Sequence, residues 1–429
     1  MFPTTGADPG SRCEPGRAAV DRWRTAARVL DEVRREPGLT RVALADRLRL
    51  SSATTTETVA RLRAAGWVDE ERAPVAGRGR PTTRLVPSPA GPTVLGLDLR
   101  HEDWRLGVAG LDGVATVVAS GRRVRACPEE VASAVAARDA LALAVSFPAP
   151  LSDGRVVRSG ELDWTTLDLA RLTGSPSLPV LQGNDATLAG LAEGRSGAAA
   201  GAGTALTLLV EVGLGGTLLI DGRPQTGAHG AAGEFGHLPF GDPSVVCPCG
   251  ARGCWGPEVD GYGLARRLGV PAPTDPRSFA SAVLDRSDPA AVDAVAGASA
   301  ALGRGLAGLV NAHDPDVVVL GGLAPRLRGP AFDEAYRAGL MSWRRDVPPP
   351  VRDAVLGADA ALHGAVALAL DEVTSAEGLA RAALGSTPTE PAASGPAARL
   401  DALDTEVRRG RRARRTAREP EETDRDRTG

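Results

Sequence analysis

The chain has 429 residues, of which 43% are hydrophobic and 24% charged, a balance typical of a soluble globular protein with enough material for two or three domains. No apolar run is long enough to span a bilayer, and the N-terminal MFPTTGADPG lacks the hydrophobic centre of a signal peptide, so we expect a cytoplasmic protein. The net charge of −3 is unevenly spread, because residues 1–90 hold sixteen Arg against eleven acidic residues. A basic N-terminal segment on a chain that is acidic as a whole indicates a nucleic-acid-binding module attached to a larger domain.

Residues 18–88 carry the pattern of a winged helix-turn-helix domain. Apolar residues recur every three or four positions through 18–35, which predicts an amphipathic helix. Two shorter helices and two strands follow, and a basic turn joins the strands. These predicted elements are a helix over 41–50 capped by Thr40 with Val42, Ala45 and Leu48 facing inward, a helix over 53–66 with Gly66 as its C-terminal cap, and strands on either side of the turn 77–81.

The start of the third helix and the basic turn are the expected DNA contacts. In a winged helix-turn-helix, the second helix of the motif enters the major groove with its N-terminal residues on base edges. Small hydroxyl side chains there can approach bases and phosphates closely, and Arg side chains can meet phosphates or a minor groove. The alternative is three small helices with an Arg-rich solvated loop. The expected contacts are Ser51, Ser52, Thr54, Thr55, Thr56, Arg61, Arg78 and Arg80.

From Thr93 onward, strands and helices alternate in an α/β pattern. The predicted strands cover 93–100, 104–108, 115–118, 141–150 with its exit turn, 178–181, 205–212 and 316–320. The predicted helices cover 128–143, 186–194, 262–268, 279–284, 290–313 and 362–373. Asn184 and Asp185 follow a strand directly, which places a carboxylate where open α/β sheets bind ligands. Asp185 could also cap the helix that follows it.

Three cysteines and one histidine lie within eighteen residues and predict a zinc site. Clustered cysteines in a reducing compartment are more often metal ligands than disulfides. Three thiolates and one imidazole complete a tetrahedral shell, which leaves no open position and indicates a structural ion, one per chain. The alternative is a turn of reduced cysteines without metal, and Cys13 and Cys127 lie outside the cluster. The predicted ligands are His237, Cys247, Cys249 and Cys254.

Residues 374–429 differ in composition from everything before them. The segment includes the linker-like STPTEPAASGPAA in its first half and holds eleven Arg and ten acidic residues with few apolar ones. This composition predicts a disordered charged tail, with a short helix around 400–418. Its RRGRRARR run could touch DNA phosphates or acidic partners, but a solvated polyampholyte is the favoured interpretation.

Taken in order, these motifs resemble the ROK family of repressors, open reading frames and sugar kinases. The likeness covers about residues 20–373 and is carried by the basic wing, the strand ending near Asp98, NDA, VGLGG, GAAGEFGH, CxCGxxGC and VVLGG. The resemblance implies a two-lobed, actin-like ATPase fold over 92–373 behind the winged domain. It also implies that the zinc lies beside a sugar site and that His237 faces both. The sugar-contacting positions that it implies are Asn184, Asp185, Glu234 and His237.

The chain departs from the kinases of this family at three places. Gly256 stands where they carry a sugar-binding Glu, and the nearest acid is Glu258. The segment matching their Asn-Leu-x-Trp sugar loop reads Glu161-Leu162-Asp163-Trp164. Their DxGGT-type phosphate turn is here the run 98–103, which has no glycine for close backbone approach and in which Glu102 and Asp103 repel phosphate. Only Asp98 could still ligate magnesium there.

The sequence therefore predicts a transcriptional repressor controlled by a sugar or sugar derivative, without enzyme activity. The winged domain would bind operator DNA as a homodimer or homotetramer, and ligand in the cleft between the lobes would change the spacing of paired winged domains. One alternative is a sugar kinase with an appended DNA-binding domain, in which Asp185 would be the general base. Another is a regulator whose cleft docks a protein.

Overall fold

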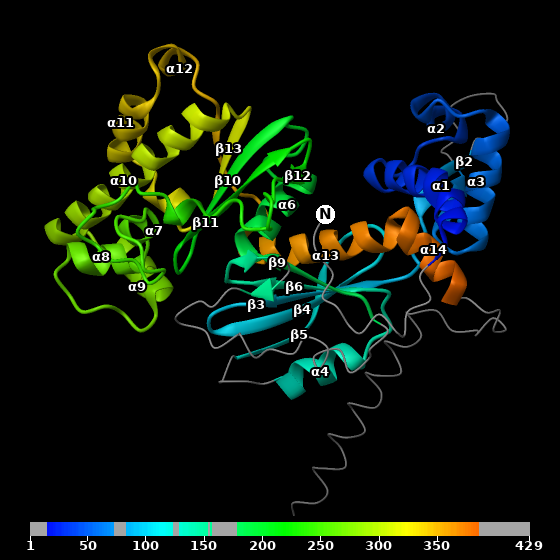
Figure 1. Ribbon diagram of the computed structural model, residues 1–429, viewed down its shortest axis with the longest axis horizontal. Helices are drawn as coiled ribbons and strands as arrows, with labels where there is room; N and C mark the ends of the chain where they lie inside the picture. Colours follow the sequence, from blue (N-terminus) through cyan, green and yellow to red (C-terminus); the bar gives the residue numbers. More distant parts are fainter. Residues whose placement is uncertain (1–14, 73–82, 123–127, 153–154, 157–177, 386–429) are drawn as a thin grey trace, which may run out of the picture.

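The computed structural model describes residues 15–72, 83–122, 128–152, 155–156 and 178–385. Two α/β lobes lie side by side, and an N-terminal helical module sits against one of them (Figure 1). Among the described residues, no helix is both long enough and apolar enough to cross a membrane.

The N-terminal module has the predicted helices and ribbon. Its elements are α1 (Arg17–Arg35), α2 (Arg41–Leu48), α3 (Ser52–Ala64), β1 (Val68–Arg72) and β2 (Thr83–Pro87). The two strands pair antiparallel. Thr40 caps α2 by accepting a hydrogen bond of 3.2 Å from the backbone N–H of Ala43, and Gly66 takes a φ of 75° just after α3.

Of the three residues predicted to face inward on α2, Ala45 and Leu48 are half-buried and Leu48 packs on the core, but Val42 does not face inward. Leu44 is fully buried among Leu30, Val59 and Leu62, whereas Val42 is 80% exposed. At about 100° per residue, Val42 lies about 200° around the helix from Leu44, so the two cannot share a face. A helix of two turns repeats its pattern too few times for periodicity alone to identify the buried side.

Lobe one is built on a five-stranded sheet in the order β5-β4-β3-β6-β9. Its strands are β3 (Val94–Leu99), β4 (Asp103–Ala109), β5 (Thr116–Arg122), β6 (Leu143–Phe147) and β9 (Val180–Asn184), beside the small hairpin β7 (Leu151–Ser152) and β8 (Arg155–Val156). β4 runs antiparallel to β3 and β5, while β6 and β9 continue parallel to β3. The helix α4 (Pro128–Ala136) packs Val131 and Val135 on one face of this sheet and ends before the predicted 143.

Lobe two is built on a second five-stranded sheet in the order β12-β11-β10-β13-β14. Its strands are β10 (Thr204–Val210), β11 (Leu214–Ile220), β12 (Arg223–Pro224), β13 (Val317–Gly322) and β14 (Val351–Asp353). Its helices are α7 (Gly256–Val259), α8 (Gly261–Arg267), α9 (Pro276–Leu284), α10 (Pro289–His313), α11 (Pro330–Gly339) and α12 (Ser342–Asp346), with single 3₁₀ turns η2 (Phe235–His237), η3 (Ala324–Leu327) and η4 (Gly357–Asp359). The glycine-rich 212–216 is not wholly a turn, because β11 begins at Leu214.

Two helices join the lobes. The helix α6 (Asp185–Ser196) packs on α13 (Ala360–Thr374) on one side and on β10 and β11 on the other. The approach is so close that a Cβ on Gly364 would lie 1.9 Å from the backbone oxygen of Leu188, and one on Gly190 would lie 2.4 Å from Oγ1 of Thr207. Since α13 covers the sheet of lobe one, α6 and α13 form a tightly packed link between the two sheets.

A helix occupies the start of the segment whose composition predicts a disordered tail. The helix α14 (Ala376–Gly385) packs on α1, and the orange and blue ribbons lie together in Figure 1. Leu379 is 1% exposed and shares one hydrophobic cluster with Trp23 and Leu30. Counting composition from 374 onward hides the few apolar residues gathered in this helix. The remaining residues 386–429, with the RRGRRARR run, lie outside the described part.

The contact between α1 and lobe one also contains polar bonds. Nη1 of Arg34 in α1 donates to Oγ1 of Thr374 at 3.2 Å, and its Nε donates to the backbone oxygen of Leu111 at 3.0 Å. The N-terminal module therefore packs on α14 and on the end of α13, which is one of the two helices that link the lobes.

Candidate ligand and metal site

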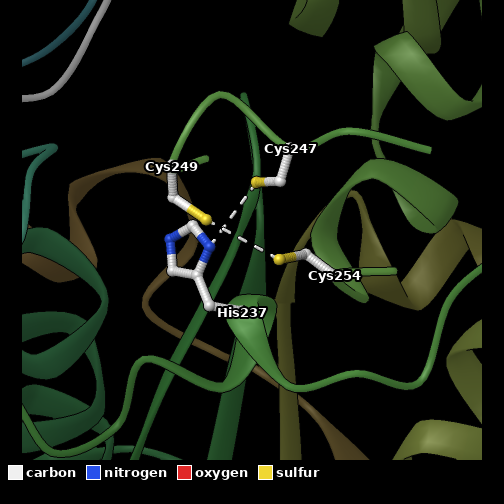
Figure 2. Close-up of side chains that lie close together, drawn as sticks. All are labelled: His237, Cys247, Cys249 and Cys254. Atoms are coloured by element: carbon white, nitrogen blue, oxygen red, sulfur yellow. Dashed lines mark hydrogen bonds between the residues drawn. The ribbon is translucent and has the colours of Figure 1, made fainter. Parts of the chain in front are cut away.

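The four predicted metal ligands come together. Figure 2 shows the His237 ring and the three sulfur atoms turned toward one another, and the candidate ligand atoms all lie within 4.8 Å of each other. His237 comes from η2, and the three cysteines come from the loop that precedes α7. The lone histidine and the CxCGxxGC loop, which are separate in the sequence, therefore form one cluster.

The spacing of these atoms fits a tetrahedral ion. Nδ1 of His237 lies 3.6 Å from Sγ of Cys247, and Sγ of Cys249 lies 3.7 Å from Sγ of Cys254. Bond lengths of about 2.3 Å to sulfur and about 2.0 Å to nitrogen separate neighbouring ligands of a tetrahedron by about 3.8 Å (sulfur to sulfur) and about 3.6 Å (sulfur to nitrogen). The cluster can therefore hold a metal ion with little movement.

The loop that carries the cysteines is shaped by two glycines. Gly250 and Gly253 have φ values of 94° and 72°, a region that side chains rarely adopt. The backbone N–H of Cys247 donates to the oxygen of Ala251 at 2.8 Å, which closes the loop. These local bonds place three sulfurs on one side of a short turn.

Trp255, which sequence reasoning missed, fastens this loop to lobe two. It is fully buried, and its Nε1 donates to the backbone oxygen of Ala301 in α10 at 2.9 Å. A Cβ on Gly305 would lie 2.2 Å from the indole, so α10 has a glycine where the ring packs. A tryptophan directly after the last cysteine was the available signal, because a residue so large usually belongs to a core.

His237 connects the metal cluster to the cleft. Its Nδ1 faces the sulfur atoms, while its Nε2 lies 3.8 Å from Oε2 of Glu234. A metal-bound histidine commonly directs its other ring nitrogen at a carboxylate, which orients the ring. Burial raises the pKa of Glu234.

Asn184 and Asp185 make different hydrogen bonds at the start of α6. Oδ1 of Asn184 accepts the cap hydrogen bond from the N–H of Thr187 at 3.1 Å, so the capping role considered for Asp185 falls to Asn184. Oδ1 of Asp185 accepts from the N–H of Ala186 at 2.8 Å. Burial raises the pKa of Asp185 to about 7, with a further contribution from the negative charges of Asp98, Glu211 and Glu234.

Glu258 does not replace the acid that is missing at Gly256. It is buried, and its carboxylate accepts from Arg266 at 2.7 Å and from Arg267 at 2.6 Å. It also accepts from the backbone N–H of Asp242 at 3.3 Å. Glu258 therefore stabilises α8 and the metal loop.

A cavity of about 430 Å³ lies between the lobes beside the metal cluster. Lobe one contributes Pro148 and Pro150, and lobe two contributes the hairpin around Leu214, the metal loop and α8. Of the four predicted sugar-contacting residues, His237 alone lines it.

Within the run 98–103, the side chain of Arg100 is bonded to Asp98 and to the backbone of Ala358. Nε of Arg100 lies 2.6 Å from Oδ2 of Asp98, and Nη2 donates to the backbone oxygen of Ala358 at 2.5 Å. Asp359, next to Ala358, accepts from Arg100 at 3.2 Å and also from Arg105. The N–H of Arg100 is bonded to the oxygen of Asp103 at 2.9 Å. The carboxylate of Asp98, considered above as a magnesium ligand, is thus paired with an internal cation.

The structure changes the set of expected DNA contacts. Ser52, Thr54 and Thr56 are exposed on α3, and Ser51 is exposed but caps that helix through Thr54. Thr55 is 1% exposed and bonds to the backbone of Ser51, so its expected DNA contact is wrong. It occupies the buried side of α3 with Val59 and Leu62, a full turn and two turns later.

Arg61 is engaged within the module. Its guanidinium donates to the backbone oxygen of Arg22 at 3.0 Å and to Glu57 at 2.9 Å, and it lies over the ring of Trp23. A phosphate contact would have to compete with these bonds. Arg78 and Arg80, and the segment 161–164, lie outside the described residues.

Comparisons with known proteins agree with this arrangement. Residues 129–372 match the ROK family and residues 24–79 match the MarR family. The chain is 32% identical over 241 residues to a kanosamine kinase from Amycolatopsis mediterranei, covering 53% of this chain and 76% of that protein. It is 30% identical over 206 residues to a putative xylose repressor from Caldicellulosiruptor sp., covering 43% of this chain and 50% of that protein. A crystal structure described as a ROK family transcriptional regulator, a homolog of the E. coli MLC protein, matches with a TM-score of 0.69 and 21% identity over 85% of this chain and 100% of that one.

Proposed function

Since the chain belongs to the ROK family and carries a MarR-type winged helix ahead of the ROK region, we propose that it is a transcriptional repressor controlled by a sugar or sugar derivative. The DNA-binding domain would span 18–88 and the ligand-sensing domain 92–373. The exposed hydroxyls of α3 and the wing arginines Arg78 and Arg80 would contact an operator, with two winged domains of a homodimer or homotetramer on a two-fold site.

The observation that favours a regulator over a kinase is the pairing of Arg100 with Asp98. Phosphoryl transfer depends on groups that wrap the phosphates and on a metal that neutralises them. Asp98 is 1% exposed, and its carboxylate is bonded to Arg100. A magnesium ion could reach Asp98 only if the guanidinium of Arg100 were displaced, which would cost its bonds to Asp98, Ala358 and Asp359. Both the geometry and this cost oppose ATP-dependent chemistry.

Zinc is the metal that the cluster suits best. Three sulfurs and one imidazole at tetrahedral spacing are a donor set typical of structural zinc, and a closed shell leaves no position for substrate. Zinc at His237, Cys247, Cys249 and Cys254 would fix one wall of the cleft. Held by the ion through Nδ1, the imidazole would keep Nε2 turned toward Glu234 and the ligand.

The ligand would contact Asn184, Asp185, Glu234 and His237. Asp185 begins α6, α6 packs on α13, and α13 leads into α14, which packs on α1. A change at the ligand therefore has a continuous packed route to the winged domain. Such a route supports allostery only if the ligand binds two arrangements of the lobes with different affinity.

The second candidate is a sugar kinase with an appended DNA-binding domain. The pKa of about 7 at Asp185 favours it, because a carboxylate that titrates near neutral pH is suited to general-base catalysis. The similarity to kanosamine kinase points the same way.

One experiment separates the two candidates. Purified protein is mixed with fragmented genomic DNA and the retained fragments are sequenced, while ADP production is followed with a panel of hexoses and ATP. A regulator retains a defined set of fragments and releases no sugar-dependent ADP. Steady ADP production that requires both a sugar and Asp185 would establish the kinase.

A further inference from the structure

The cavity beside the metal cluster is largely apolar. Its walls include Pro148 and Pro150 from lobe one and Val212, Leu214, Val245 and Val246 from lobe two. Its volume of about 430 Å³ falls in the range of about 300–1,000 Å³ that is typical of pockets for drug-sized ligands. A sugar ring alone needs a polar partner for most of its hydroxyls. On these walls the apolar residues and glycines outnumber the polar side chains, which are His101, His237, Asp260, Tyr262 and Arg266.

The charged residues of the lining are already bonded within the protein. Oδ1 of Asp260 caps α8 by accepting from the N–H of Gly263 at 2.9 Å. Arg266 donates to the backbone oxygen of Pro257 at 2.9 Å and pairs with Glu258. A hydroxyl placed in this cavity would have to compete with those bonds, whereas an apolar group would not.

Two glycines keep the cavity open. A Cβ on Gly256 would meet only the backbone of Gly236 and Leu214, no closer than 3.4 Å, so a side chain could start there. A Cβ on Gly213 would meet nothing within 4 Å. Both glycines line the cavity, so a larger residue at either position would add a side chain to its wall.

We propose that the effector is a sugar derivative with an apolar substituent, and that this substituent occupies the cavity. The sugar ring lies against Asp185, Glu234 and His237, and an aryl group extends from it between Pro148, Leu214 and Val246. This inference rests on the proposed sugar-responsive function and adds the class of ligand. Burial of apolar surface from water supplies the extra affinity.

The test compares parent sugars with matched derivatives. Isothermal titration of the full chain is run with glucose, galactose, mannose and xylose and with both anomers of their phenyl glycosides. At least one derivative is expected to bind tenfold or more tightly than its parent sugar. Gly213→Leu, which fills the cavity, is expected to remove that gain while the parent's affinity stays within twofold.

Two further variants make the result specific. Gly16→Leu is the matched control, because a Cβ there also meets nothing within 4 Å but lies in the winged module, and it should keep the gain. Val246→Asp, at an exposed position on the cavity wall, should lower the affinity for the derivative and not for the parent. This variant tests the cavity even if Gly213→Leu fails to fold.

The outcomes separate the two proposals. Parent sugars that bind as tightly as their derivatives would overturn the apolar pocket and leave the sugar-responsive function standing. Equal losses for parent and derivative in Gly213→Leu and Val246→Asp would do the same. Binding of no sugar and no derivative would overturn both.

Discussion

Nε of Arg100 lies 2.6 Å from Oδ2 of Asp98 at the end of the first strand of lobe one. The same guanidinium reaches Ala358, 258 positions later in the chain, so it also ties this strand to the turn before α13. An arginine thus supplies positive charge where the sugar kinases that this chain resembles use a glycine turn around phosphates. This pairing supports the proposal that the chain is a regulator rather than a kinase.

We predict strong coupling between Arg100 and Asp98. Arg100→Met should lower the free energy of unfolding by roughly 2–4 kcal/mol, because it leaves the buried carboxylate unpaired. Asp98→Asn combined with Arg100→Met should cost less than the sum of the two single changes, with a coupling of about 1–3 kcal/mol. Urea unfolding of the four proteins measures this, and strictly additive losses would show that the pair does not interact.

Asp185 should make the protein less stable as the pH rises. Its pKa is about 7 in the folded chain against the ordinary 3.8, so between pH 4 and 7 only the unfolded chain loses this proton. The stabilisation that protonated Asp185 contributes is therefore fully present below pH 4 and is lost as the pH rises through 7. Asp185→Asn should match the wild type at pH 4 and exceed it by about 2 kcal/mol at pH 8, with allowance for partial solvent access.

The measurement for Asp185 is urea unfolding at several pH values, with the difference between variant and wild type as the readout. Glu211 and Glu234 also have raised pKa values, and their negative charges act on Asp185, so the difference reports Asp185 together with its coupling to these two groups. A difference that does not change with pH would show that Asp185 titrates at its ordinary value.

Metal content should depend on the exposed ligand Cys249 as much as on the buried ligands Cys247 and Cys254. Freshly prepared, reduced protein should hold about one zinc per chain. Cys249→Ser, at an exposed position, should bind zinc at least tenfold more weakly and should lower the thermal stability of lobe two. Metal analysis of the dialysed proteins checks this, with Cys13→Ser as the control outside the cluster. Wild-type protein without zinc would remove the site.

The wing should contribute to DNA affinity through charge. Replacing Arg78 and Arg80 with Gln should weaken operator binding across sequences and lower the slope of log affinity against log salt by about 1–2, since each lost phosphate contact removes about 0.9. Anisotropy titrations at several salt concentrations give the slope. Arg61→Gln is the comparison, because its guanidinium is bonded within the module, and an unchanged slope for the wing variant would place the wing off the DNA.

Local signals in the sequence were enough for the winged module, the five-stranded sheet of lobe one and the cluster of candidate metal ligands. In lobe two they predicted β10 and β13 but not β11, β12 or β14. His237 and the three cysteines could be predicted because the donor types and the glycines between them lie within one short stretch. The burial of Thr55 could not be predicted, because α3 has hydroxyl residues on both its buried and exposed sides. The prediction that Val42 faces inward was wrong because α2 has only two turns. The contacts of Arg100 with residue 358 and of α14 with α1 join distant parts of the chain, which local patterns do not report.

The central claim is that a sugar or sugar derivative controls DNA binding by this chain. Its most direct test is an anisotropy titration of a selected operator fragment, with and without the sugar or derivative that binds most tightly, at fixed salt. We predict that saturating ligand changes the Kd for the operator at least fivefold in the wild type, a coupling of about 1 kcal/mol, and leaves it unchanged in Asp185→Asn. An operator Kd that is the same with and without saturating ligand in the wild type would contradict it.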